Sequence, residues 1–254
     1  MFPKFFFCRG CSFPTNSILC ESCRRSLTWN ERILPSPSSG LSGVAPLLYS
    51  FEQTQKIIRS WKEEGGSLLE RSLFRMPAGL KEALSGLAFD GVVPVPQSLK
   101  RSYRRGHDSA RSVADFFSRE LEVPVLPLLE LGIRDPARQT GRTRFERDFS
   151  SNPFRISRGF PWNSKAIHRI ERQVQSGIET RILIVDDLIT SGSTLTKAAS
   201  RIHDLIPRAR CWAGTLGFRP KPVRPAHPPN RTPAAEPRND GQSAQDPSST
   251  RENP

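Results

Sequence analysis

Two carboxylates and a hydroxyl-rich turn follow a run of β-forming residues in the last third of the chain. Asp186 and Asp187 come directly after the apolar residues 182–185, and the turn at residues 190–194 precedes a stretch with helical periodicity. Such a turn can direct several free backbone N–H groups at one point, beside the positive end of the helix dipole. Because Gly192 has no Cβ, the backbone can come close to a bound anion. We therefore expect an anion site sized for a phosphate monoester, with hydroxyl donors from Thr190, Ser191, Ser193 and Thr194.

Asp186 and Asp187 would repel a phosphate and need a different ligand. Vicinal ribose hydroxyls and the coordination shell of Mg²⁺ are the groups that carboxylates bind well. The alternative interpretation is an ordinary helix N-cap of Ser or Thr, preceded by two surface acids. Because the two acids follow four β-forming residues at the carboxyl end of an expected buried strand, the pattern favours a ribose 5-phosphate site.

Residues 185–194 closely resemble the phosphoribosyl-pyrophosphate signature of type I phosphoribosyltransferases. The resemblance implies that Thr190–Thr194 hold a 5′-phosphate, that Asp186 and Asp187 bind the ribose 2′- and 3′-hydroxyls, and that Mg²⁺ lies on the pyrophosphate. It implies a twisted, mostly parallel α/β sheet with flanking helices. If the protein is an enzyme, it displaces pyrophosphate from C1′ through an oxocarbenium-like state, with Asp186 or Asp187 nearest the developing positive charge. No residue stands out as a general base for the acceptor.

A basic loop follows the expected strand at residues 89–96. If this strand and the one at 182–185 are parallel neighbours, the loop lies near the phosphate turn. Its cations would then meet pyrophosphate; the alternative is a solvated basic loop. The residues concerned are Lys100, Arg101, Arg104 and Arg105.

Four of the five cysteines lie close together near the N-terminus, as the pairs Cys8 and Cys11, and Cys20 and Cys23. Each Cys-x-x-Cys pair can present two thiolates, and four thiolates make a closed tetrahedral zinc site with a structural role. A redox-active pair is the competing interpretation, which two adjacent pairs disfavour. Cys211 stands alone in an expected strand and is interpreted as a core residue.

Arginines alternate with phenylalanines in the segment 138–158. Cations that contact phosphates, together with rings that stack under bases, suit single-stranded nucleic acid. A hood loop that closes over a small substrate would have a similar composition. The sequence leaves both interpretations open.

The elements that position these residues follow from hydrophobic periodicity. Residues 109–121 and 194–206 each place apolar side chains on one helical face, and residues 122–128 and 211–216 are expected to add short strands. A strand, a helix and a second strand in this order make a right-handed crossover unit. The sequence thus predicts an α/β domain over residues 47–218, preceded by a cysteine module (1–30) and a linker rich in Pro, Ser and Gly (31–46). The tail (219–254) has no aromatic residue and is expected to be disordered.

A net charge of +13 favours polyanionic partners, although a solvated basic surface would have the same charge. No apolar run reaches the roughly 18 residues that a membrane helix needs, and residues 1–7 are too short for a signal-peptide core. We therefore expect a cytoplasmic protein.

The cysteine pairs, the basic loop and the late Asp-Asp turn together resemble the ComF family of phosphoribosyltransferase-like proteins, which is tied to bacterial competence and DNA uptake. The likeness covers most of residues 5–218. It implies phosphoribosyl pyrophosphate as ligand, a place in nucleotide metabolism or DNA uptake, and partners such as single-stranded DNA, a competence helicase or other uptake proteins. A non-catalytic module that binds single-stranded DNA is the alternative function. Further matching residues are Tyr49, Ile57, Ile58, Lys62, 94–96, Arg105, Gly106, Arg134, Gln139, Glu146 and Arg147.

Two positions depart from the ComF pattern. Members of the family continue the Arg-Gly pair with an aromatic residue, Asn and Gln, whereas His107, Asp108 and Ser109 follow here. Asp108 would put a negative charge where pyrophosphate is expected. Pro136 stands near the place of a Thr that members carry before the residue matched by Gln139. The sequence therefore supports the binding of a ribose phosphate more strongly than it supports catalysis.

Overall fold

The computed structural model describes residues 6–64, 67–98, 103, 105–132, 152–157 and 165–219. The chain divides into two units, Met1–Lys221 and Pro222–Pro254, and the described residues all belong to the first. The expected disorder of the tail falls outside the described residues beyond Arg219. The same holds for Lys100, Arg101 and Arg104 and for most of the segment 138–158.

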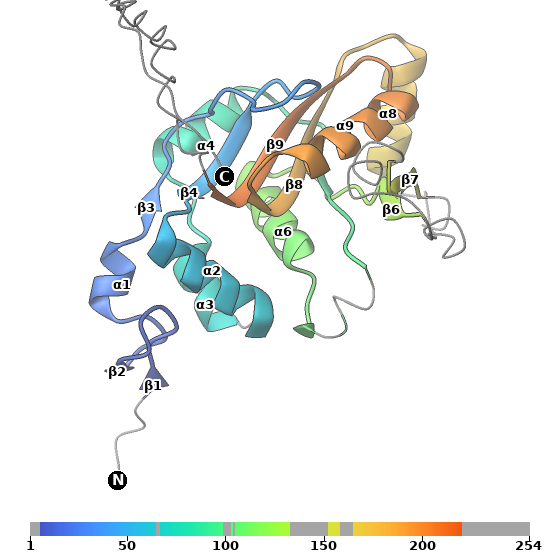
Figure 1. The fold of residues 1–254 in the computed structure, drawn as a ribbon. Coiled ribbons are helices and arrows are strands. Elements are labelled where there is room, and N and C mark those ends of the chain that lie inside the picture. Colours follow the sequence, from blue (N-terminus) through green and yellow to red (C-terminus); the bar gives the residue numbers. More distant parts are fainter. Residues whose placement is uncertain are drawn as a thin grey trace, which may run out of the picture. The chain divides into compact units, whose positions relative to one another are not determined.

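A five-stranded, mostly parallel sheet forms the centre of the first unit (Figure 1). Its strands are β3 (Thr28–Trp29), β4 (Val44–Tyr49), β9 (Ala209–Phe218), β8 (Thr180–Ile189) and β5 (Gly91–Pro94), in that order across the sheet. β4, β9, β8 and β5 run parallel, and β3 pairs antiparallel with β4 at one edge. The predicted α/β class with a mostly parallel sheet is confirmed. β8 is the apolar run expected of a strand covered on both faces, and it extends through both aspartates.

The two faces of the sheet are covered by different helices, and the alternation of side chains along β8 explains the division. Leu183 and Val185 join the core formed with α2 (Glu52–Glu64), α4 (Ala78–Ser85) and α6 (Ser109–Leu121). Ile182 and Ile184 join the opposite core, which contains the buried residues of α9 (Ser193–Leu205) and Ile170 of α8 (Lys165–Gln175). A further short helix, α3 (Ser67–Leu73), follows α2.

The helices expected at 109–121 and 194–206 are confirmed as α6 and, shifted by one residue, α9. The strands expected at 182–185 and 211–216 lie within β8 and β9. The strand expected within 122–128 is wrong, because this segment makes only an isolated bridge between Val92 and Val125. Two local features explain the error: Glu122 ends α6 in the left-handed conformation at a φ of 56°, and Pro124 has no N–H to donate to a ladder.

The segment before β4 carries more structure than a linker composition suggests. β4 begins at Val44, and Leu34 forms a bridge with Val44. The backbone N–H of Ser42 donates to Cys211 O at 2.7 Å, so this segment extends the hydrogen bonding of β9. Leu41 is buried in the core beneath α9.

Short elements flank the sheet at two places. β1 (Phe6–Phe7) pairs with β2 (Pro14–Thr15), and α1 (Glu21–Arg25) follows them in the cysteine segment. β6 (Leu129–Leu131) and β7 (Phe154–Ile156) form an antiparallel pair that contacts α9. None of the helices in the described ranges combines the length and the hydropathy that crossing a membrane would take.

Candidate functional site

The turn between β8 and α9 has the geometry of an anion-binding loop. Gly192 stands at the N-cap of α9 at a φ of 76°, a left-handed conformation that glycine adopts without strain. Gly192 offers no side chain to cap the helix, and among the first amides of α9 the N–H of Ser193 lies 3.4 Å from Ser191 Oγ. The first amides of α9 are therefore turned toward the loop, where the positive end of the helix dipole favours a negative ligand. The neighbouring side chains of Thr190, Ser191, Ser193 and Thr194 are exposed.

A segment distant in sequence lies against this loop. A Cβ at Gly192 would come within 3.3 Å of Pro37 Cγ and 3.2 Å of Ser38 Oγ. Ser38 Oγ is buried and has no hydrogen-bond partner among the described residues. Ser38 is thus a further hydroxyl beside the loop, and its position within a Pro- and Ser-rich stretch gave no sequence signal for that role.

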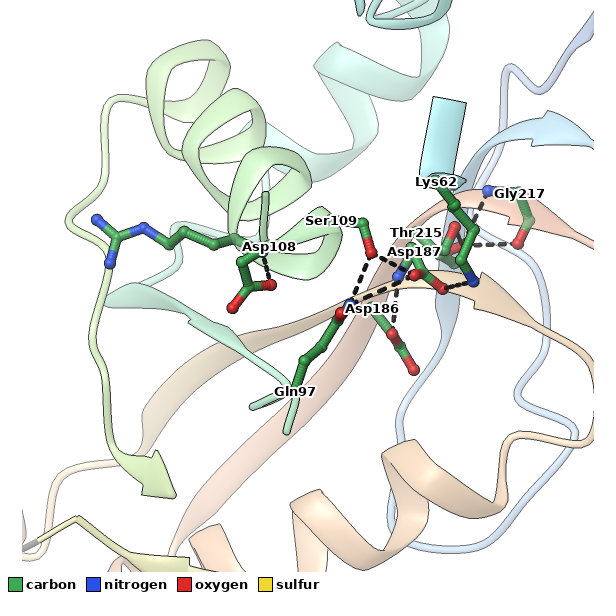
Figure 2. A network of polar contacts seen from close by, with 9 residues as sticks. Lys62, Gln97, Asp108, Ser109, Asp186, Asp187, Thr215 and Gly217 are labelled. Carbon is green, nitrogen blue, oxygen red and sulfur yellow. Dashed lines mark hydrogen bonds and ion pairs between the residues drawn. The ribbon is translucent and has the colours of Figure 1, made fainter. Parts of the chain in front are cut away.

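Asp187 is buried, and its carboxylate is held by three side chains from other elements (Figure 2). Lys62 Nζ of α2 donates to Oδ1 at 2.8 Å, and Ser109 Oγ at the start of α6 donates to Oδ2 at 2.6 Å. Gln97 Nε2 donates to Ser109 Oγ at 2.6 Å and lies 3.4 Å from Asp187 Oδ2. The side chains of Lys62 and Asp187 are only 22% and 8% exposed, so water screens this ion pair weakly.

Asp186 has a different environment from its neighbour. One of its carboxylate oxygens, Oδ1, accepts the backbone N–H of Asp187 at 2.8 Å, and the side chain points away from the Lys62 pair (Figure 2). Asp186 is half-buried and Asp187 is buried, and both line the same cavity; the carboxylate of Asp187 in addition contacts Lys62 and Ser109. The two adjacent acids therefore differ in burial and in the side chains that contact them.

This cavity, which we call the sheet-end cavity, has a volume of about 920 Å³. It brings Asp186, Asp187 and Thr194 together with Gln97, which follows β5, and Lys62 of α2. The opposite wall is formed by Leu129–Leu131 of β6 and by Pro153 and Phe154 at β7. The cavity lies where β5 and β8 end, which is the expected ligand position in an open α/β sheet.

Three side chains at this site were not assigned to it from the sequence. Lys62 matched the family pattern without a role, and Gln97 and Ser109 were not singled out as ligands. Ser109 is separated from Asp187 by 78 residues and Lys62 by 125, so only the assembled sheet brings them together. An isolated polar side chain at a buried helix start is the one local signal that could have indicated Ser109.

Of the four cations expected to meet pyrophosphate, Arg105 falls within the described residues. It lines a neighbouring cavity of about 550 Å³ beside α2, which shares Lys62 with the sheet-end cavity. Asp108, expected to oppose pyrophosphate, is the N-cap of α6, and its Oδ1 accepts the backbone N–H of Arg111 at 3.0 Å (Figure 2). This acid therefore caps the helix that carries Ser109.

The four N-terminal cysteines converge on one point. The sulfur atoms of Cys8, Cys11, Cys20 and Cys23 all lie within 4.8 Å of one another. Thiolates around tetrahedral zinc are separated by about 3.8 Å, from a Zn–S distance of about 2.3 Å. The four thiols could thus hold a metal ion such as zinc after small adjustments.

Backbone amides and a tight glycine support this cysteine cluster. The N–H groups of Cys20 and Gly10 donate to Cys8 Sγ at 3.2 and 3.4 Å. A Cβ at Gly10 would come within 2.7 Å of Cys23 Sγ, so the loop accepts only glycine without a shift. Gln53 Nε2 of α2 donates to Cys23 Sγ at 3.2 Å, which ties the cluster to the main core.

The thiols differ in acidity. Burial raises the pKa of Cys23 to about 12, and the neighbouring thiols act in the same direction. Burial also opposes ionisation of Cys8, but the amides of Cys20, Cys11 and Gly10 outweigh it and lower the pKa of Cys8 to about 6. A cation among the sulfurs would remove the penalty for further thiolates. Cys211 is a buried core residue, as predicted, and burial raises its pKa to about 12.

No protein-family model matches this chain, and no curated protein matches it significantly. The functional assignment therefore depends on the sequence motifs and on the geometry of the site.

Proposed function

We propose that the protein binds phosphoribosyl pyrophosphate, or a related ribose 5-phosphate ligand, in the sheet-end cavity. One observation carries the proposal: a helix start with a left-handed glycine as its N-cap and a half-buried carboxylate border the same cavity at the end of a parallel strand. The start of α9 suits a phosphate, and the carboxylate of Asp186 suits ribose hydroxyls. The short turn between β8 and α9 fixes the distance between these two groups.

The phosphate part of the ligand would lie against residues 190–194. The first amides of α9 and the exposed hydroxyls of Ser191, Ser193 and Thr194 supply donors, and Thr194 already lines the cavity. Ser38 adds a buried hydroxyl without a partner in the described ranges. Preformed donors of this kind bind an anion without a large ordering cost.

The ribose part would be held by Asp186 rather than by both acids. Both acids border the cavity, but Asp187 is buried and already accepts hydrogen bonds from Lys62 and Ser109, whereas Asp186 is half-buried. Asp186 and Glu130, which lines the opposite wall, supply the carboxylate oxygens that Mg²⁺ prefers. When bound, Mg²⁺ would neutralise charge on the pyrophosphate.

If the protein turns its ligand over, its own residues act by positioning and by charge. The loop fixes the 5′-phosphate, and Asp186 fixes the ribose and stabilises positive charge at C1′. Lys62, Ser109 and Gln97 hold Asp187, whose backbone continues directly from Asp186. Residues of the β6–β7 pair line the far side of the cavity.

These features support membership of the type I phosphoribosyltransferase fold and, within it, a protein of the ComF type linked to DNA uptake and nucleotide metabolism. The parallel sheet, the loop after β8 and the N-terminal cysteine cluster agree with that proposal. We further propose that the cysteine cluster binds zinc in a structural role. Its four thiols leave no open coordination position, and two of them, Cys8 and Cys23, are buried in the main core.

A pair of glycine variants tests the proposed site. Gly192→Ala should weaken binding of phosphoribosyl pyrophosphate with Mg²⁺ at least about tenfold, because the new Cβ strains the backbone and crowds Pro37 and Ser38. Gly40→Ala is the matched control, since Gly40 also has a positive φ, of 84°, but nothing lies within 4 Å of its Cβ position. Equal affinities of the two variants in equilibrium binding would refute the site.

The alternative function, binding of single-stranded DNA without catalysis, depends mainly on the arginines and phenylalanines of 138–158. Of this segment only residues 152–157 are described. The alternative stays a prediction that oligonucleotide binding would test, with an affinity that falls steeply as salt rises.

A further inference from the structure

An apolar groove lies between the C-terminal ends of α8 and α9, which stand side by side in the fold (Figure 1). Two adjoining cavities of about 200 and 310 Å³ form it, and Val174, Gln175 and Ile206 line both. We call it the α8–α9 groove. Because α8 and α9 end just before β8 and β9 begin, the groove lies at the opposite end of these strands from the sheet-end cavity.

Three large apolar side chains of this groove are exposed to water. Ile170 of α8 is buried in the core, and Val174, one helical turn further along, is 37% exposed. Ile178, which follows α8, is 54% exposed, and Leu205 at the end of α9 is 39% exposed. Single exposed apolar side chains are ordinary on a protein surface, but a group of them around one groove is typical of a contact with another molecule.

The two ends of the groove carry opposite charges. Glu171 lines the smaller cavity together with Leu205. Arg208 lines the larger cavity together with Ile178. Val174 lies between these ends as a wall of both cavities. Along the groove, an acid beside a leucine is thus followed by a valine and then by an isoleucine beside a cation.

Neither charge is held firmly within its own chain. Glu171 Oε2 lies 3.1 Å from His168 Nδ1, and both side chains are more than half exposed. Arg208 is exposed, and its Nη1 donates to the carbonyl oxygen of Gly177. Exposed contacts of this kind contribute little and exchange readily with water, so Glu171 and Arg208 remain available to a partner.

This arrangement is complementary to itself. A two-fold axis through Val174 turns the acidic end of one copy onto the basic end of the other. Glu171 then faces the partner's Arg208, and Leu205 faces the partner's Ile178. The axis generates each of these contacts twice, and it brings the two Val174 side chains together at the centre.

Other occupants fit the groove less well. Its lining residues carry one acid and one cation, so the groove has no net charge that would attract a polyanion such as nucleic acid. Residues 222–254 contain no Leu, Ile, Met or aromatic residue that could fill an apolar groove. A second copy of the chain supplies both the apolar side chains and the opposite charges.

We propose that the α8–α9 groove is the interface of a homodimer, with Val174 on the two-fold axis and Glu171 paired with the partner's Arg208. Apolar side chains at the centre supply affinity, and the charge pairs at the rim fix the orientation of the two copies. The proposal is independent of the ligand of the sheet-end cavity, which lies at the other end of the strands.

Sedimentation equilibrium of the full chain at several concentrations tests the interface. We expect a monomer–dimer equilibrium, and a protein that stays monomeric up to about 100 μM would overturn the proposal. Val174→Glu places two like charges together at the axis and should raise the dissociation constant of the dimer at least about tenfold.

Leu68→Glu is the matched control for Val174→Glu. Leu68 of α3 is also an exposed apolar side chain, and it lies outside the groove. This variant should leave the dissociation constant unchanged. Equal constants in the two glutamate variants would overturn the interface.

An exchange of charges tests the orientation of the two copies. Glu171→Arg and Arg208→Glu should each raise the dissociation constant at least about tenfold, because each variant sets like charges against each other twice. The double variant restores opposite charges and should return the constant to within about threefold of that of the unaltered protein. A double variant as weak as the single ones would overturn the pairing of Glu171 with the partner's Arg208. A dimer that responds to none of these substitutions would show that another surface holds the copies together.

Discussion

At the scale of single residues, the environment of Asp187 determines what its neighbour Asp186 can do. Burial of a carboxylate is costly, and here Lys62 and Ser109 offset that cost with charge and hydrogen bonds. The backbone N–H of Asp187 in turn donates to Asp186 Oδ1 at 2.8 Å. This hydrogen bond orients the carboxylate of Asp186. Both acids line the cavity, and Asp187 has structural contacts in addition.

Replacing Lys62 by methionine should lower the free energy of unfolding by about 2 to 3 kcal/mol, because it leaves Asp187 buried without its counter-charge. Adding Asp187→Asn should recover part of this loss. Urea denaturation measures both effects.

The control for this variant is Lys81→Met, which removes an ion pair with Glu120 whose side chains are 50% and 33% exposed. Its cost should stay below about 1 kcal/mol. Equal stabilities of the two lysine variants would contradict the role given to Lys62.

At the scale of elements, hydrophobic periodicity was readable from the sequence. The apolar faces of α6 and α9 and the buried run of β8 were placed correctly because each repeats over several turns or residues. Pro124 was misread because an apolar composition resembles a strand even where the ladder is broken.

The partners of the site were not readable in the same way. Residues 190–194 are contiguous, so the prediction of a phosphate site there came from their order alone. Lys62, Gln97 and Ser109 come from three other elements and meet Asp187 only through the packing of α2 and α6 on the sheet. Asp108 was interpreted from its charge, whereas its position makes it the cap of α6.

The cysteine segment is an element whose support can be tested through Gly10. Gly10→Ala should weaken zinc affinity about tenfold or more, because a Cβ would lie 2.7 Å from Cys23 Sγ and 3.1 Å from Gln53 Nε2. Competition with a chromophoric chelator measures the affinity.

Gly86→Ala provides the control for that experiment. Gly86 has a right-handed φ of −63°, and its Cβ position lies 3.6 Å or more from the nearest carbonyl oxygens. The zinc affinity of Gly86→Ala should equal that of the unaltered protein. If Gly10→Ala bound zinc equally tightly, Gly10 would not be required for the metal site.

At the scale of the whole molecule, the sheet is complete before the second unit begins. β9 ends at Phe218, and the N–H of Arg219 donates to Ile189 O at 3.0 Å. The buried residues within the described ranges all precede Pro222. We infer that the first unit, Met1–Lys221, contains the packing that stabilises the sheet.

Deleting Pro222–Pro254 should therefore shift the melting temperature by less than about 2 °C in scanning calorimetry. A deletion that starts at Phe218 should lower the melting temperature more. It removes two backbone hydrogen bonds, from the N–H of Ser50 to Phe218 O at 2.8 Å and from the N–H of Arg219 to Ile189 O. A large loss of stability from the shorter deletion alone would contradict this division of the chain.

The central claim is that the sheet-end cavity binds a ribose 5-phosphate ligand through the loop after β8 and through Asp186. Isothermal titration of the full chain with phosphoribosyl pyrophosphate in the presence of Mg²⁺ tests it most directly. We predict saturable heat with one ligand per chain, lost or weakened at least about tenfold by Asp186→Asn, which keeps the acceptor for the Asp187 amide but removes the charge. Absence of heat with the unaltered protein, or unchanged affinity in Asp186→Asn, would contradict it.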